Sequence, residues 1–470
     1  MYAVTTFGLP MLGSLLALIA DHYSARLRNI VAILVTLATF LSAVAIVPLA
    51  REGKVFMLGP MSFPGFNFSF IVDGLGVYLA VMSSLIGFLI VLYSLGYMKD
   101  YAHQGEYYFL VILFLGAMMG LVLSANLLLI YIFWEITAIC SWRLIGFFRD
   151  PEHLRSADTA LMMTVFGSFF MLIGIEIVWH DAGTLLVTGI RGHEISNLAF
   201  FFIFLGILAK SAQVPLQVWL PAAGVAPSPV TALLHAAVLV VIGVFAFARI
   251  FVGTLLLTPN WQAATSAVAV TTILVASASA LTEKNAKRIL AYSTLGQLGY
   301  VYLGLASMTH IGVAGALVFL LAHSLAKAGL FLCIGIIEKR THTRDIGELG
   351  GLIREMPWTA AAFIACSLTI IGFPPTAGFF GKLMIVMGSF QGVHPAFGLL
   401  AALGGVLSIV YMLRLFNAVF LGKARWSGIG EGTPVMVASV IAFAILSMLI
   451  GLAARPLLDV VQALVAQISG

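Results

Sequence analysis

The chain has 470 residues, of which 61% are hydrophobic and only 9% are charged. Soluble domains carry about 25% charged residues, so this composition excludes a soluble globular protein and predicts an integral membrane protein. The net charge of +5 at pH 7 requires no nucleic-acid partner. The three cysteines have no CxxC spacing and no glycine-rich nucleotide motif is present, so we expect no redox cofactor, disulfide or metal site.

Hydropathy predicts an all-α fold that crosses the membrane repeatedly. A helix needs about 20 apolar residues to span a bilayer, and on this criterion the sequence contains fourteen expected spans. They lie near 2–20, 29–49, 70–97, 107–124, 126–147, 158–179, 197–220 (broken), 230–252, 262–281, 288–306, 311–337, 358–389 (broken), 396–421 and 434–454.

Basic residues are distributed unevenly between the two sets of loops. One set holds 14 of them: Arg26, Arg28, Lys99, Arg149, Arg155, Lys284, Lys287, Arg288, Lys339, Arg340, Arg344, Arg354, Lys423 and Arg425. The other set holds 4: Arg51, Lys54, Arg191 and Arg455. Because cytoplasmic loops carry the excess of Lys and Arg, the first set is predicted to be cytoplasmic. Both termini would then face outward from a cell inner (cytoplasmic) membrane.

The first broken span ends an apolar helix with a lysine, Lys210. Four prolines fall within the fifteen residues 215–229, so no continuous helix can run through them. A lysine in hydrocarbon costs roughly 2.5–3.5 kcal/mol on insertion scales, and broken helices are tolerated where they are buried in protein or line a wet cavity. Lys210 beside a break therefore predicts an ion path. The alternative is a lysine that snorkels to the interface.

Glu135 lies near the middle of the fifth span, in LLLIYIFWEITAIC. A glutamate at this depth is protonated unless a cation lies close by. Lys210 is the natural candidate for that cation, which predicts a coupled Glu135–Lys210 unit. The alternative is an ion pair that only holds two helices together.

The eleventh span carries His323 and Lys327 in LLAHSLAKAGLFL. Their i, i+4 spacing places both side chains on one helix face. Because histidine titrates near neutrality, the pair is interpreted as two adjacent proton stations. The alternative for His323 is a core histidine that bonds to a backbone carbonyl.

The twelfth span, LTIIGFPPTAGFFGKLMI, is the second broken one, and Lys382 follows its break. The two halves of the chain thus each contain an interrupted helix with a lysine beside the interruption. Paired discontinuous helices in corresponding positions are typical of inverted-repeat transporters. The alternative for Lys382 is a snorkelling anchor beyond a proline kink.

Other charged residues give weaker signals. Asp73 is positioned to start the third span, and Arg143 is interpreted as an anchor that snorkels toward the cytoplasmic end of the fifth span. Arg249 lies near the end of a span, and residues 339–351 are interpreted as a cytoplasmic loop without metal-ligand spacing.

Four motifs resemble the antiporter-like subunits shared by respiratory complex I, Mrp-type cation/proton antiporters and membrane-bound hydrogenases. They are AKSAQVPLQVWLPAAGVAPSPVTALLHAA, KRILAYSTLGQLGY, HSLAKAGLFL and GFPPTAGFFGK. With the segment that contains FWEITAICSWRLIGFF, the likeness covers most of residues 70–385. The wording of FWEIT and APSPVTALLHAA is closest to the Mrp-A and hydrogenase-associated members.

The resemblance implies two inverted five-helix repeats and a chain of polar residues along the membrane midplane. It divides the sequence into 1–106 (helices 1–3), 107–254 (first repeat), 255–422 (second repeat) and 423–470 (helix 14). Matched motif by motif, it implies six residues of a proton pathway: Glu135, Lys210, His235, His323, Lys327 and Lys382.

The sequence departs from the family at Val241, where many relatives carry a lysine. His235 lies six residues earlier, about 9 Å along a helix at roughly 1.5 Å per residue. This distance is too long for a direct hydrogen bond, which needs about 3 Å. We therefore expect protons to cross between Lys210 and the His323/Lys327 pair through His235 and ordered water. Arg143 stands where relatives usually have an apolar or aromatic residue, and we expect no long lateral arm after the fourteenth span.

Three functions are compatible with these features. The sequence favours a proton-translocating subunit of an energy-converting complex of the NADH/quinone oxidoreductase or hydrogenase type, with the redox chemistry in partner subunits. The second interpretation is a subunit of a Mrp-type Na⁺/H⁺ antiporter. A structural subunit without conduction is the third, and the density of charges inside the spans argues against it.

Overall fold

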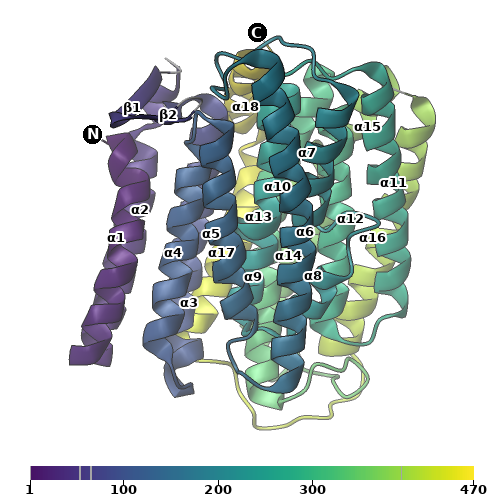
Figure 1. The fold of residues 1–470 in the computed structure, drawn as a ribbon. Coiled ribbons are helices and arrows are strands. Elements are labelled where there is room, and N and C mark those ends of the chain that lie inside the picture. Colours follow the sequence, from purple (N-terminus) through teal and green to yellow (C-terminus); the bar gives the residue numbers. More distant parts are fainter. Residues whose placement is uncertain (1, 52–53, 64–65, 393, 470) are drawn as a thin grey trace.

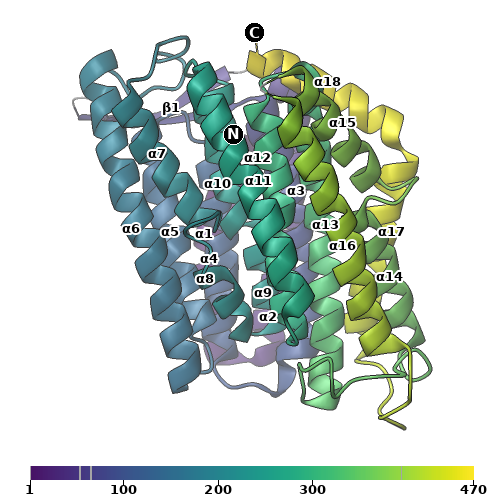
Figure 2. The same cartoon turned by 90° about the vertical axis from the view of Figure 1, so that its right-hand side faces the viewer.

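The protein is described by a computed structural model that covers residues 2–51, 54–63, 66–392 and 394–469. The helices run almost parallel to one another and form a single bundle (Figures 1 and 2). Eleven helices in the described part of the chain are long and apolar enough to cross a membrane.

The first part of the chain contains six long helices and a short hairpin. The helices are α1 Tyr2–Tyr23, α2 Ala25–Ala45, α3 Gly74–Tyr97, α4 Gln104–Val122, α5 Leu127–Ile145 and α6 Pro151–Ala182. The hairpin consists of β1 Lys54–Phe63 and β2 Phe66–Val72, paired antiparallel with Lys54 opposite Val72.

The middle of the chain contains the first break and the most buried helices. Its elements are α7 Asn197–Lys210, α8 Trp219–Ala222, α9 Ser228–Ala232, a π-helical turn Leu233–Ala237, α10 Leu239–Phe247, a second π-helical turn Ala248–Val252, α11 Pro259–Thr282, α12 Ala286–Ala306 and α13 His310–Thr341.

The last part of the chain contains the second break. Its helices are α14 Pro357–Ile371, α15 Ala377–Gln391, α16 Pro395–Phe420, α17 Pro434–Leu452 and α18 Ala454–Ser469. The start of α1 and helix α18 lie at the same end of the bundle, uppermost in Figure 1. Each expected span coincides with one helix or with a group of short helices that follow one another.

Two features were not predicted from the sequence: the β1–β2 hairpin and helix α18. Residues 70–72 belong to strand β2 and not to the third span, because β2 pairs with β1 along the backbone and α3 begins only at Gly74. Helix α18 was not predicted. Its 16 residues would reach only about 24 Å at roughly 1.5 Å per residue, too short for a typical span. In Figures 1 and 2 it lies across the end of the bundle.

Both predicted helix breaks are present. Helix α7 ends at Lys210, and Ala212 then takes a left-handed backbone conformation with φ 52° before Pro215. Helix α14 ends at Ile371 and is followed by Gly372, whose φ of 84° is a conformation that favours glycine, and α15 starts after Pro374 and Pro375. Each break frees backbone carbonyls inside the bundle, because a helix end leaves its last carbonyls without helical partners.

The segment 228–252 and helix α13 form the centre of the bundle. Every residue of 228–252 is buried, and α13 is almost as completely covered. The two elements pack against each other along α9 and its following π-helical turn. Polar residues on these two elements are therefore shielded from lipid on all sides, which is the position that an internal proton path requires.

Candidate functional site

Lys210 is fully buried at the end of α7 and is held by the neighbouring helix α5. Its Nζ donates to the carbonyl oxygen of Trp134 over 3.1 Å and lies 5.1 Å from the centre of the Trp134 ring. This buried contact excludes the alternative of a snorkelling lysine. The π face of tryptophan offers the ammonium group some electrostatic compensation for its lost water.

Glu135 follows Trp134 and is partly buried. Its Oε1 atom is buried without a hydrogen-bond partner among the described residues. The charge of Glu135 acts on Lys210, but the direct contact of Lys210 is with the Trp134 carbonyl. Glu135 and Lys210 are therefore neighbours without the direct ion pair that a purely structural role would need.

His235 lies in the π-helical turn Leu233–Ala237 and is fully buried. Neither ring nitrogen has a hydrogen-bond partner among the described residues. The ring stacks on Phe331 of α13, with centroids 4.4 Å apart. π-helical turns inside α-helices occur frequently at functional sites, and here the turn carries an unpaired titratable ring.

His323 and Lys327 lie on the side of α13 that faces this turn. Lys327 Nζ donates to the carbonyl oxygen of Leu290 in α12 over 3.1 Å. The Lys327 charge is close enough to interact electrostatically with the rings of both His235 and His323. By strict geometry neither ring nitrogen of His323 has a hydrogen-bond partner among the described residues, but the ring lies close enough to the His235 backbone to interact with it.

Lys382 lies one turn into α15 and reaches back to the end of α14. Its Nζ donates to the carbonyl oxygen of Ile370 over 2.7 Å and lies 4.8 Å from the centre of the Tyr300 ring. The side chain is buried and bonded to the freed carbonyls of the break, which excludes the snorkelling alternative. Carbonyls at a helix C-terminus carry partial negative charge that stabilises a cation.

Four of the six predicted residues lie close enough together to interact electrostatically. They are His235, His323, Lys327 and Lys382. Lys327 acts on His235 and His323, and Lys382 in turn acts on Lys327. Lys210 and Glu135 form a second group on α7 and α5. Among the described residues, no set of three or more His, Cys, Asp or Glu side chains is placed to hold a metal ion.

Two hydroxyls that the sequence did not single out lie next to Lys210. Ser211 is within 2.6 Å of the Tyr302 hydroxyl, and its Oγ donates to the carbonyl of Val240 over 3.3 Å. Val241 itself is fully buried. Both hydroxyls lie beside Val241, the position where the resemblance implies a lysine. A water-mediated crossing needs such polar atoms, because a buried water must have hydrogen-bond partners.

Sequence analysis also missed the ion pairs at the two ends of segment 228–252. Asp73 accepts two hydrogen bonds from the Arg249 guanidinium, one of them 2.8 Å long, and it caps α3 by accepting from the Gly76 amide. At the other end, Glu338 pairs with Lys287 and Arg344. Arg143 lies in the last turn of α5 and pairs there with Glu106.

We expect Asp73→Asn to destabilise the protein by about 3–5 kcal/mol, the usual cost of removing one partner of a buried pair. Asparagine still caps a helix well, so the loss reports the Arg249 contact. Thermal unfolding of the purified protein measures it. The matched control is Asp181→Asn, whose partner His180 is exposed, and it should leave the unfolding midpoint unchanged. An equal midpoint for both variants would contradict the prediction.

Comparison with known proteins agrees with the described geometry. The sequence pattern of the family "NADH:quinone oxidoreductase/Mrp antiporter, TM" matches residues 124–408, and that of "NADH-Ubiquinone oxidoreductase (complex I), chain 5 N-terminus" matches residues 61–108. The first match alone covers well over half of the chain and contains all six predicted pathway residues.

Curated relatives include components of sodium/proton antiporters. The chain is 34% identical over 423 residues to the A1 component of a Na(+)/H(+) antiporter of Staphylococcus saprophyticus, covering 83% of this chain and 52% of the relative. It is 34% identical over 397 residues to a Na(+)/H(+) antiporter component of Alkalihalophilus pseudofirmus, covering 77% and 49%. The chain thus spans about half the length of these relatives.

Solved structures share the fold over almost the whole chain. A chain of the Mrp complex from a Dietzia species superposes with a TM-score of 0.90 at 23% identity, covering 100% of this chain and 97% of that one. A chain of respiratory complex I from Thermus thermophilus superposes with a TM-score of 0.86 at 25% identity and 100% coverage of both. The chain therefore belongs to the NADH:quinone oxidoreductase/Mrp antiporter family and is a multi-pass membrane protein.

Proposed function

We propose that the chain is a proton-translocating subunit of a Mrp-type Na⁺/H⁺ antiporter complex. The observation that carries this proposal is the likeness to relatives named as components of Na(+)/H(+) antiporters, at 34% identity over most of this chain. This reverses the order of preference from the sequence alone, which placed the redox-driven complex first. Neighbouring membrane subunits would be its partners.

The buried residues support proton transfer along the middle of the bundle. Lys210, Lys327 and Lys382 are each held by a carbonyl oxygen instead of a carboxylate. A lysine without a bonded counter-ion in a dry environment releases its proton more readily than one in water. In the described part of the chain, the ring nitrogens of His235 and His323 have no partner that meets strict hydrogen-bond geometry, so each ring is able to accept a proton and pass it on.

The proposal includes the topology expected from the sequence. The chain would cross the membrane fourteen times, with 107–254 and 255–422 as inverted repeats that each contain one broken helix. The end of the bundle that carries the loops with most basic residues would face the cytoplasm, and both termini would face outward. The common end of α1 and α18 is compatible with this orientation (Figure 1).

A second candidate is a proton-translocating subunit of a redox-driven complex. The specific observation in its favour is the likeness to a chain of respiratory complex I from Thermus thermophilus, which superposes with a TM-score of 0.86 at 25% identity, against 23% identity for the Mrp chain. In that case electron transfer in partner subunits would supply the driving force.

Transport by the purified native complex in vesicles separates the two candidates. An imposed Na⁺ gradient, without any electron donor, should drive proton movement that a pH-sensitive dye reports. The same vesicles tested with an electron donor and a quinone give the comparison. Proton movement that requires the electron donor and ignores Na⁺ would favour the second candidate and contradict the first.

A further inference from the structure

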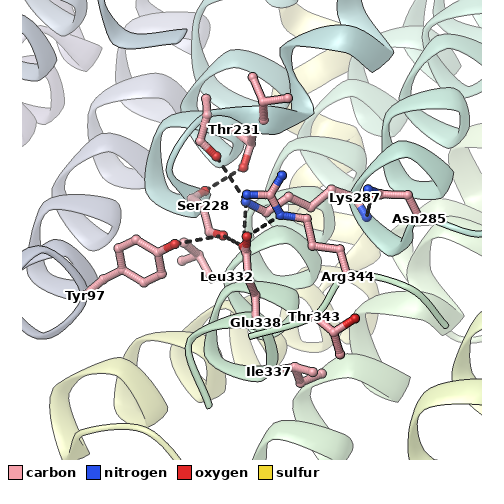
Figure 3. Close-up of polar contacts among 12 residues, drawn as sticks. Tyr97, Ser228, Thr231, Asn285, Lys287, Leu332, Ile337, Glu338, Thr343 and Arg344 are labelled. Carbon is pink, nitrogen blue, oxygen red and sulfur yellow. Dashed lines mark hydrogen bonds and ion pairs between the residues drawn. The ribbon is translucent and has the colours of Figure 1, made fainter. Parts of the chain in front are cut away.

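Glu338 lies near the end of α13 at the centre of a buried polar cluster (Figure 3). Its carboxylate is 2.7 Å from Lys287 Nζ, is paired with Arg344, and accepts a 3.1 Å hydrogen bond from Ser228 Oγ. Lys287 is itself 1% exposed and also donates to the Ala226 carbonyl over 3.0 Å. One negative charge thus faces two positive charges at this point.

A cavity of about 900 Å³ opens directly onto this cluster. It lies at the end of the bundle that carries the basic loops, and Glu338 and Arg344 form part of its wall. Tyr97, Tyr101 and Lys339 line it as well. The cavity is large enough for many water molecules, since one water occupies about 30 Å³ of liquid.

On the inner side, Glu338 connects to the segment that carries His235. Ser228 is the first residue of α9, and its Oγ also accepts a weak 3.5 Å hydrogen bond from the Tyr97 hydroxyl (Figure 3). His235 is seven residues further along, about 10 Å at roughly 1.5 Å per residue. The Ser228 hydroxyl is thus placed between the cavity and the predicted proton station.

Gly335 keeps this connection open. A Cβ atom at Gly335 would lie 2.7 Å from the Tyr93 hydroxyl and 2.9 Å from Ser228 Oγ, closer than packed atoms allow. The absence of a side chain at Gly335 therefore leaves room for both hydroxyls, one turn inside Glu338. Tyr93 in turn donates to the Leu332 carbonyl over 2.9 Å, next to Phe331, on which His235 stacks.

We propose that Glu338 is the proton acceptor between the cavity and the buried pathway, and that Ser228 relays its proton toward His235. This inference rests on the proposed function and adds the residues that load the pathway from one side. Burial disfavours the Glu338 charge, but Lys287 and Arg344 hold the pKa of this carboxyl below its usual value, so it is protonated only transiently. It takes the proton from hydronium in the cavity, which leaves neutral water, and Lys287 and Arg344 then lack their counter-charge. The Ser228 hydroxyl, which donates to Glu338 in this structure, then turns to accept the proton and donates its own to a water molecule on the His235 side, and the carboxylate returns to its two cations.

The alternative is that the cluster only ties α12, α13 and the following loop together. Ser228→Ala separates the two roles, because it removes one hydroxyl and leaves both ion pairs of Glu338 intact. The matched control is Ser94→Ala, which removes a buried hydroxyl from α3 that contacts Tyr107 and does not line the cavity.

The experiment measures proton flux through the native complex in vesicles, together with thermal unfolding. We expect Ser228→Ala to slow proton flux about tenfold or more, in the range of a lost proton-transfer group, with an unchanged unfolding midpoint. Ser94→Ala should keep wild-type flux. Glu338→Gln should lose at least as much flux as Ser228→Ala.

Two outcomes distinguish failure of this inference from failure of the proposed function. Wild-type flux in Ser228→Ala, in a complex where Glu135→Gln reduces flux, overturns the relay and leaves proton transport standing. A wild-type complex that moves no protons under any gradient or electron donor contradicts proton transport, and the relay with it.

Discussion

Lys327→Met should abolish proton transport and leave the fold at least as stable as before. Lys327 is fully buried, and among the described residues its Nζ bonds only to the Leu290 carbonyl. It lies beside two histidines and within range of the Lys382 charge. Methionine fills a similar volume without charge. Removing a cation that has no bonded counter-ion should be neutral or stabilising, as replacing buried ion pairs by apolar residues often is, by roughly 1–4 kcal/mol.

The two effects together identify a functional charge. Flux should fall about a hundredfold or more, because the residue that connects three other stations can no longer carry a proton. Proton flux in vesicles and thermal unfolding of the same preparation measure both quantities. Lys284→Met, at an exposed position before α12, is the control and should change neither. Reduced stability with preserved flux would show that Lys327 has a structural role instead.

Local chemistry explains how much of the fold could be predicted from the sequence. Runs of apolar residues define spans without reference to the rest of the chain, and both breaks follow from prolines and glycines at the break itself. The hairpin and α18 were missed because a criterion based on local hydropathy and length does not detect them. Strand β2 merges into the apolar run of α3, and α18 is amphipathic and too short for the length criterion.

The sequence predicts which charged residues lie inside the spans, but it does not predict their partners. A charge inside an apolar span is visible in the sequence, as Lys210, Lys327 and Lys382 show. Their actual partners are backbone carbonyls of Trp134, Leu290 and Ile370, and every residue type has a carbonyl. Lys287 was counted among the loop residues, although it is buried in α12 and paired with Glu338.

The two ion pairs that sequence analysis missed contact the two ends of segment 228–252. Ser228 begins segment 228–252 and bonds to Glu338, while Arg249 near its other end pairs with Asp73. The Arg249–Asp73 pair joins residues 176 positions apart, so no local pattern points to it. Charged groups thus hold both ends of the segment that carries His235. The π-helical turn lies between them, and its histidine ring has no hydrogen-bond partner among the described residues.

Glu135→Gln should reduce proton flux at least about tenfold while the protein still inserts and assembles. A glutamine has nearly the same shape, and no ion pair is broken, because Lys210 bonds to the Trp134 carbonyl and Glu135 Oε1 has no described partner. The loss therefore reflects the charge, which biases the proton affinity of Lys210 from a neighbouring position. Glu176→Gln is the matched control, since Glu176 is also an acidic residue in a span but lies exposed on α6.

The coupling between the two groups provides the decisive measurement. If Glu135 acts by setting the proton affinity of Lys210, then Lys210→Met should remove its effect. Glu135→Gln added to Lys210→Met should lower the flux no further, whereas independent roles would multiply the two losses. Flux from the four proteins of this double-mutant cycle, normalised to assembled complex, tests the prediction. Multiplied losses would place Glu135 on a route of its own, and wild-type flux in Glu135→Gln alone would remove it from the pathway.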